Sequence, residues 1–207
     1  MTVSLILFLN ICLIVTSAFP WAQSYSYMKK NITMEKFGRS FLSTFIFILI
    51  FMYFLYPDFY TSFINPFACR DMIFIIVSVL GAIVFENLIF KFKYKKCFLI
   101  KIPQNFYLLI FIGFLIPIAE EILFRGILKY LFDIYAFPKV LYICISSICF
   151  GLNHMIYGYI NIITKTFWGI FFAFSYCLTG NLLISIIAHI MINLIYVVIA
   201  KRKRNYA

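Results

Sequence analysis

The chain has 207 residues, of which 65% are apolar and only 12% carry a charge. Because a soluble domain usually has about 25% charged residues, this composition excludes a soluble enzyme, a disordered chain and a disulfide-rich secreted domain. Continuous apolar runs, instead of alternating polar and apolar residues, also exclude a membrane β-barrel. The basic residues behind the net charge of +11 lie in short blocks between these runs. Their placement indicates membrane topology and argues against a nucleic-acid partner.

Seven apolar segments are predicted to cross the bilayer as helices, since each approaches the roughly 20 residues that a span requires. In chain order they cover residues 3–19, 40–56, 72–90, 104–124, 140–154, 160–178 and 182–200. The first segment is interpreted as a retained anchor because its basic pair, Lys29 and Lys30, follows it. No repeat or linker separates the segments. The sequence therefore predicts an all-α, polytopic helical bundle that forms one membrane domain over residues 1–207.

Basic residues are shared unequally between the two sides of the membrane. Thirteen Lys and Arg fall in the first loop, the third loop and the C-terminal tail, whereas Arg70, Lys129 and Lys139 fall on the other side. The positive-inside rule then places the N-terminus outside and the C-terminus inside. We expect an integral, multi-pass protein of a bacterial plasma membrane.

Several of the few acidic residues and both histidines lie in apolar segments, where an ionisable side chain is unfavourable. The chain has seven acidic residues and two histidines. Three of the acids (Glu86, Glu120 and Glu121) and both histidines (His154 and His189) lie in apolar segments. An ionisable group inside a membrane helix costs at least about 2.5 kcal/mol, so each is a candidate functional residue.

The fourth segment carries two adjacent acids followed by an arginine. Neighbouring helical residues point about 100° apart, so Glu120 and Glu121 are expected on different faces. Glu121 and Arg125 are four residues apart with the acid first, which favours an ion pair. Glu120 is then left without a local counter-charge, as suits a general base or acid. A purely structural polar cluster is the alternative for this motif.

Two further segments supply the other candidates. Phe150 and His154 lie one turn apart, as do His189 and Asn193. An intramembrane histidine often serves only as a hydrogen-bonding contact between helices. Histidines, a carboxylate and an amide from three spans can, however, provide a base, a proton carrier and donors for an oxyanion. His154, His189 and Glu120 could also bind a divalent metal such as Zn²⁺.

Other polar residues have simpler interpretations. Glu86 precedes the basic loop that begins at Lys91 and is interpreted as an interfacial, snorkelling residue, as is Lys165. Gly113 and Pro117 are expected to bend the fourth helix just before its acids. With straight helices, His154 would lie about 12 Å deeper than Glu120 and His189.

Three ordered motifs resemble those of the CPBP family, which comprises CaaX proteases and bacteriocin-processing intramembrane proteases. The family patterns are E-E-x-x-x-R, F-x-x-x-H and H-x-x-x-N/D. Here they are met by Glu120, Glu121 and Arg125, by Phe150 and His154, and by His189 and Asn193. The resemblance covers about residues 113–195, the motif-bearing core.

This resemblance implies hydrolysis of a peptide bond in a membrane-associated peptide or protein. Glu120 would activate water with help from His154, while His189 and Asn193 would stabilise the oxyanion or lie beside a metal. The acid–arginine pair would support them. The family is described both as metalloproteases and as metal-independent glutamate proteases, and both descriptions stay open here.

Two non-protease interpretations are also carried forward. The first is a non-catalytic bacteriocin-immunity or regulatory membrane protein on the same scaffold. The second is a small transporter, for which intramembrane Glu and His are also typical. The absence of an inverted repeat in the sequence disfavours the transporter.

Overall fold

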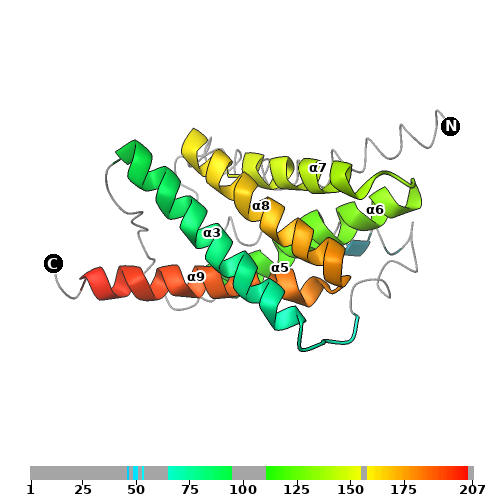
Figure 1. Cartoon of the computed structure of the whole chain (residues 1–207), viewed down its shortest axis with the longest axis horizontal. Helices are drawn as coiled ribbons and strands as arrows, with labels where there is room; N and C mark the ends of the chain where they lie inside the picture. Colours follow the sequence, from blue (N-terminus) through cyan, green and yellow to red (C-terminus); the bar gives the residue numbers. More distant parts are fainter. Residues whose placement is uncertain are drawn as a thin grey trace.

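The computed structural model describes residues 65–94, 111–154 and 158–204, together with Ile46, Leu49, Ile50 and Tyr53. These residues contain helices and no strands (Figure 1), which confirms the all-α prediction for this part of the chain. The helices are α3 (Asp71–Tyr94), η2 (Phe111–Leu115), α5 (Ile116–Glu121), η3 (Ile122–Ile127), α6 (Leu128–Ile134), α7 (Lys139–Leu152), α8 (Tyr159–Thr179) and α9 (Leu182–Arg204). Helices η2 and η3 are π-helical.

Three helices are long and apolar enough to cross a membrane. They cover Asp71–Phe92, Tyr159–Thr179 and Leu182–Ile199, and α7 is a shorter apolar helix. All four lie where spans are predicted. The predicted spans 3–19 and 40–56 lie outside the described residues, apart from four single positions in the second, so the count of seven and the orientation stay predictions.

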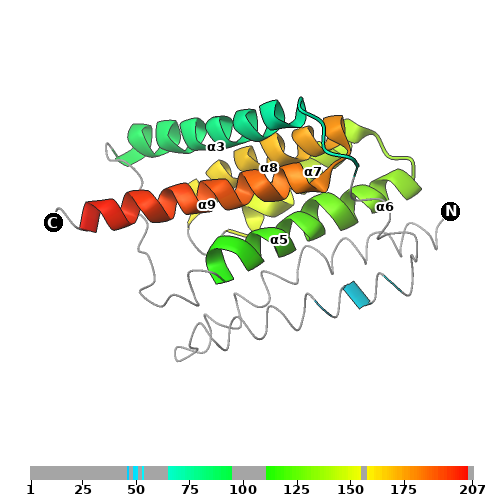
Figure 2. The ribbon, with the colours of Figure 1, turned by 90° about the horizontal axis from the view of Figure 1, so that it is seen from below.

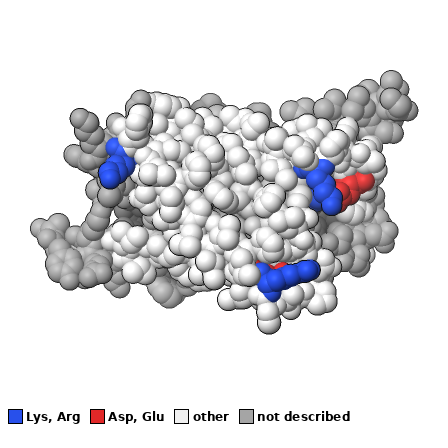
Figure 3. Space-filling view, viewed as in Figure 1, with Lys and Arg blue, Asp and Glu red and all other residues white. Residues whose placement is uncertain are grey.

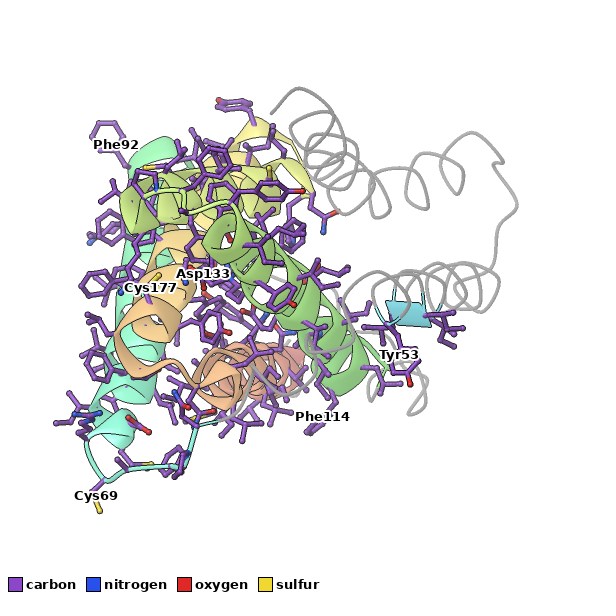
Figure 4. The ribbon with its side chains drawn as sticks, turned by 90° about the vertical axis from the view of Figure 1, so that its right-hand side faces the viewer. Tyr53, Cys69, Phe92, Phe114, Asp133 and Cys177 are labelled. Atoms are coloured by element: carbon purple, nitrogen blue, oxygen red, sulfur yellow. The ribbon has the colours of Figure 1, made fainter. Side chains whose placement is uncertain are left out.

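The surface of the bundle agrees with a lipid environment. Phe92 is 94% exposed and Phe114 is 39% exposed, and both point away from the helices in Figure 4. On the face shown in Figure 3, the described charged side chains gather toward the two ends and uncharged surface lies between them. Apolar side chains on the outside of a helical bundle are typical of contact with lipid.

The fourth predicted span, residues 104–124, ends too early. Helical structure continues without a break from Phe111 to Ile134. Lys129 therefore lies in α6 and not in a loop, and it forms an ion pair with Asp133 one turn later. The helix continues because this pair accommodates both charges while the intervening Leu131 is fully buried.

The helices run lengthwise beside one another. Helix α8 packs between α7 and α3, and α9 packs against α3, α8 and α5 (Figures 1 and 2). The C-terminal ends of α3, α7 and α9 and the N-terminal end of α8 point toward the same end of the bundle (Figure 1). Figure 2 shows α5 and α6 in line on the side of the bundle opposite α3.

Glycines allow α7 and α8 to approach closely. A Cβ atom on Gly169 would lie 2.7 Å from Ser147 Cα, and one on Gly151 would lie 2.6 Å from the Ile162 carbonyl oxygen. Both distances are too short for real atoms, so only glycine fits at these two positions. This contact brings the C-terminal end of α7 against α8.

Serine side chains add polar contacts between the helices. Ser146 Oγ donates to the Phe124 carbonyl oxygen at 2.8 Å and joins α7 to η3, while Ser185 Oγ donates to the Phe172 carbonyl oxygen at 3.0 Å and joins α9 to α8. Such bonds between small polar residues and backbone are a common means of joining membrane helices.

The expected difference in depth between His154 and the other candidates is not found. The turn between α6 and α7 extends further along the bundle than the start of α9 (Figures 1 and 2), so α7 begins further out than α9 does. Its C-terminal end consequently reaches the level of α5, where Asn153 contacts Glu120.

Candidate active site

Glu121 lies at the centre of the buried polar cluster. Its Oε1 atom accepts a hydrogen bond from Arg125 Nη1 at 3.1 Å and another from His189 Nδ1 at 2.9 Å. The ion pair between Glu121 and Arg125 that the spacing predicts is therefore present, with both side chains fully buried. The second motif partner, His189, arrives from α9.

Arg125 is held by more than its acid partner. Its Nη2 atom donates to the Gly169 carbonyl oxygen at 3.4 Å. The Cζ atom lies 4.3 Å from the centre of the Phe150 ring and 5.3 Å from that of Phe172. A guanidinium over aromatic faces gains cation–π attraction, which is strongest where water is excluded. Arg125 thereby joins η3 to α7 and α8.

Glu120 shares His189 with Glu121, but its hydrogen bond comes from Asn153 and not from Arg125. Its Oε1 atom accepts a hydrogen bond from Asn153 Nδ2 at 3.1 Å, and its Oε2 atom lies 3.7 Å from His189 Nε2. The expectation that the two acids face apart is wrong at the level of their carboxylates, because both reach the same imidazole. Their side chains are long enough to converge on a ring whose two nitrogens lie on opposite edges.

Aromatic rings surround the His189 imidazole. Phe172 stacks on it at 5.3 Å, while Phe150 and Trp168 meet it edge-to-face at 5.7 and 6.0 Å. His189 is 3% exposed. The three aromatic rings and the two carboxylates together hold the imidazole in one orientation.

His154 lies just beyond the last turn of α7 and is half-buried. Its Nδ1 atom lies 2.9 Å from the Phe150 carbonyl oxygen. Because a carbonyl only accepts, Nδ1 carries the hydrogen, and the acceptor of the neutral ring is Nε2. The Phe150 ring lies 5.1 Å from His154 and 5.7 Å from His189, so it separates the two imidazoles.

Asn193 is placed less centrally than the other candidates. It is half-buried on α9, one turn beyond His189. In the described part of the chain, the groups that hydrogen-bond to Glu120 and Glu121 come from Arg125, Asn153 and His189. The structure thus brings Glu120, Glu121, Arg125 and His189 into direct contact, with Phe150 packed against two of them and His154 behind that ring.

The sequence interpretation overlooked Asn153. This residue is 1% exposed and contacts Glu120 directly. It belongs to none of the three motifs, and the only signal for it was an amide side chain immediately before His154 in an apolar segment.

A second polar cluster lies beside the first. Glu86 is fully buried on α3, where its Oε1 atom lies 3.2 Å from Lys165 Nζ and its Oε2 atom accepts from Tyr196 Oη at 2.5 Å. The interpretation of Glu86 and Lys165 as snorkelling residues is therefore wrong, because each neutralises the other inside the bundle. The Lys165 ammonium also lies 3.0 Å from the centre of the Trp168 ring.

The comparison with protein families agrees with the motifs. Residues 102–195 match the family described as type II CAAX prenyl endopeptidase, Rce1-like. This part of the chain is similar to the Rce1-like family. The match confirms the resemblance to the CPBP proteins, and with the apolar helices it indicates an integral membrane protein related to CAAX proteases. The comparisons with curated proteins and with solved structures found no match.

The Rce1-like segment contains all three motifs and Asn153. It excludes α3, and it ends one residue before Tyr196. Of the second cluster, only Lys165 and Trp168 lie within the match. Glu86 and Tyr196 are therefore contributed by parts of this chain outside the Rce1-like segment.

The described residues of the Rce1-like site do not match a typical metal centre. Nowhere in the described ranges do three His, Cys, Asp or Glu side chains lie close enough to hold one ion. Glu120 and His189 approach each other, but the expected third ligand, His154, is not in that group. The Nδ1 atoms of both histidines are engaged, by Glu121 and by the Phe150 carbonyl, so Nε2 is the atom through which either ring would bind a metal. We therefore derive the chemistry from the side chains alone.

Proposed function

We propose that the chain is an intramembrane endopeptidase in which Glu120 activates water to hydrolyse a peptide bond. The observation that supports Glu120 is the nature of its partners. Among the described residues its hydrogen-bond donor is the neutral amide of Asn153, whereas the nearby cation, Arg125, pairs with Glu121. A carboxylate without a bonded cation is the better proton acceptor of the two.

In the proposed reaction, Glu120 takes a proton from water while the water oxygen bonds to the substrate carbonyl carbon. The carbonyl oxygen becomes an oxyanion, which needs donors nearby. The bond from carbon to nitrogen then breaks, and Glu120 returns the proton to the leaving amine. Glu120 thus serves as base in the first step and as acid in the second.

The two histidines would assist from either side of Phe150. His189 donates from Nδ1 to Glu121 and turns Nε2 toward Glu120. When its ring takes up a proton, Nε2 becomes a donor beside the reacting atoms. Protonation of the His154 ring would turn its Nε2 atom into a donor in the same way, and the Asn193 amide lies one turn beyond His189 on α9. These three residues are the proposed oxyanion and proton-transfer groups.

The proposed substrate is a membrane-associated peptide or protein. The family description names a CAAX prenyl endopeptidase, so a farnesylated CAAX peptide is the first substrate to test. A lipid-anchored peptide would reach a buried site from within the bilayer, which agrees with the apolar outer surface of the bundle.

The test compares cells that carry the wild-type protein with cells that carry Glu120→Gln at matched expression. Mass spectrometry of the membrane fraction and medium would search for new peptide termini. Termini present with the wild type and with Asp133→Asn, but absent with Glu120→Gln, are expected. Identical termini in all three, with every protein inserted, would contradict the protease assignment. Immunity to a bacteriocin that survives Glu120→Gln would instead support a binding protein.

A further inference from the structure

Asn153 holds a place in the site that no motif assigns. It caps the C-terminal end of α7, where its backbone N–H donates to the Cys149 carbonyl oxygen at 3.0 Å. The side chain takes no part in that cap. Its Nδ2 atom instead donates to Glu120 Oε1 at 3.1 Å, across to α5. The backbone of Asn153 therefore caps α7, and its side chain binds Glu120.

The orientation of this amide follows from the chemistry of its partner. An ionised carboxylate only accepts hydrogen bonds, so the amide must present its NH₂ group to Glu120. The amide oxygen, Oδ1, then points away from that bond. It is buried and accepts no hydrogen bond from any described residue. A buried acceptor without a donor is costly, and a water molecule can supply that donor to Oδ1.

We propose that Asn153 positions both Glu120 and the attacking water. Asn153 Nδ2 donates its hydrogen bond to Glu120 Oε1, so Glu120 Oε2 is the oxygen that accepts from the reacting water. A water molecule has two hydrogens, of which one would bond to Glu120 Oε2 and the other to Asn153 Oδ1. A lone pair of the water oxygen is then left for the substrate carbonyl carbon. This inference rests on the proposed function, in which Glu120 is the base.

The kinetic test uses the full chain in lipid nanodiscs with a farnesylated CAAX peptide. Asn153→Ala is expected to lower kcat about 10- to 100-fold, the range for losing a hydrogen bond to a charged group, with KM unchanged. Asn153→Asp keeps the shape but places a second carboxylate against Glu120, so its kcat is expected to fall at least as far. A wild-type kcat in either variant would overturn the proposal.

Asn181→Ala is the matched control. Asn181 is a fully buried asparagine at the start of α9, where Nδ2 donates to the Asn65 carbonyl oxygen and Oδ1 accepts from the Leu183 backbone. Both contacts are local to the end of the bundle at which α9 begins. Its kcat is expected to equal that of the wild type, which separates loss of a buried amide in general from loss of this one.

A second measurement does not depend on turnover. Dicyclohexylcarbodiimide attacks carboxyl groups in apolar surroundings, and mass spectrometry of fragments reports which glutamate is modified. Removing the Asn153 amide uncovers Oε1, so labelling of Glu120 is expected to rise about tenfold in Asn153→Ala and to stay unchanged in Asn181→Ala. If Asn153→Ala does not fold, the isosteric Asn153→Asp variant decides the question by its kcat.

The two measurements separate failure of this inference from failure of the proposed function. If the wild type does not cut the peptide, the proposed function fails for this substrate. The labelling of Glu120 then tests the positioning role of Asn153 by itself. Equal labelling of Glu120 in the wild type and Asn153→Ala would then overturn the positioning role.

Discussion

The Nδ1 atom of His189 lies 2.9 Å from the Oε1 atom of Glu121, although 68 residues separate them in the chain. The contact joins α9 to α5 at the centre of the bundle. It also gives the two adjacent glutamates different tasks, because the same Glu121 oxygen already pairs with Arg125. Glu121 is a buried counter-ion, and Glu120 is left for chemistry.

This division predicts opposite effects of two isosteric substitutions. Glu121→Gln leaves the Arg125 cation buried without its counter-ion, so we expect the free energy of unfolding to fall by roughly 3–5 kcal/mol. Glu120→Gln leaves a neutral pair with Asn153, so stability is expected to hold while turnover is lost. Thermal unfolding in detergent, alongside a cleavage assay, would measure both. Equal destabilisation by the two substitutions would refute the division.

The close packing of α7 on α8 predicts that glycine cannot be replaced at two positions. Gly169→Ala would place a methyl group 2.7 Å from Ser147 Cα, and Gly151→Ala would crowd the α8 backbone. Each change is expected to cost about 1–3 kcal/mol and to displace the end of α7, with loss of activity.

Gly113→Ala is the control, since nothing lies within 4 Å of its added methyl group. It is expected to be neutral or slightly stabilising, because alanine favours helix over glycine. Melting temperatures of the three purified variants would show the contrast, and a Gly113→Ala variant as unstable as the others would argue against the packing explanation.

The buried pair of Glu86 and Lys165 predicts a strong coupling energy. Glu86→Gln or Lys165→Met alone leaves one charge unpaired, at a cost of roughly 3–5 kcal/mol. The double variant removes both charges and is expected to be more stable than either single one. Lys129→Met is the comparison, because the side chain of its partner Asp133 is 57% exposed, whereas that of Glu86 is fully buried. It is expected to change stability by no more than about 1 kcal/mol.

The coupling energy would be measured with a double-mutant cycle, from the free energies of unfolding of the wild type, the two single variants and the double variant. Additive effects of the two single substitutions would mean that the pair contributes nothing, and that α3 is joined to α8 by its other contacts, which include the hydrogen bond between Ser78 and Ser175.

The predicted orientation can be checked with native cysteines. Cys69 is exposed at the end of the bundle where α3 begins. With the N-terminus outside, an impermeant thiol reagent should label Cys69 in intact cells and reach Cys97 only after permeabilisation. Variants that retain a single cysteine would give a clear signal, and the reverse labelling would invert the topology.

The ligand geometry leads us to expect that chelators leave activity unchanged. No trio of potential ligands is assembled among the described side chains. Turnover in the presence of 1,10-phenanthroline would be compared with turnover in its absence. Inhibition that Zn²⁺ reverses would show that a metal takes part.

Local spacing made part of the site predictable. The pair of Glu121 and Arg125 is one helical turn apart, so periodicity alone placed the two side chains together. The positions of α3, α7, α8 and α9 followed in the same way from the length of apolar runs. Both predictions depend on residues that are close in the chain.

Contacts between segments that are distant in the chain could not be predicted from local spacing. Glu86 pairs with Lys165, 79 residues away, and with Tyr196, 110 residues away. Nothing in the residues around Glu86 indicates those partners, and the basic loop nearby suggested an interfacial position instead. Asn153 was missed for the same reason, because its partner Glu120 lies on another helix, 33 residues away.

Trp168 connects the two buried polar clusters. The Lys165 ammonium lies over its ring, and the His189 imidazole meets its edge. The indole thus contacts both the Lys165 cation, which pairs with Glu86, and the imidazole that lies beside Glu120. A small residue in its place would leave a cavity against both groups, because Trp168 is 1% exposed.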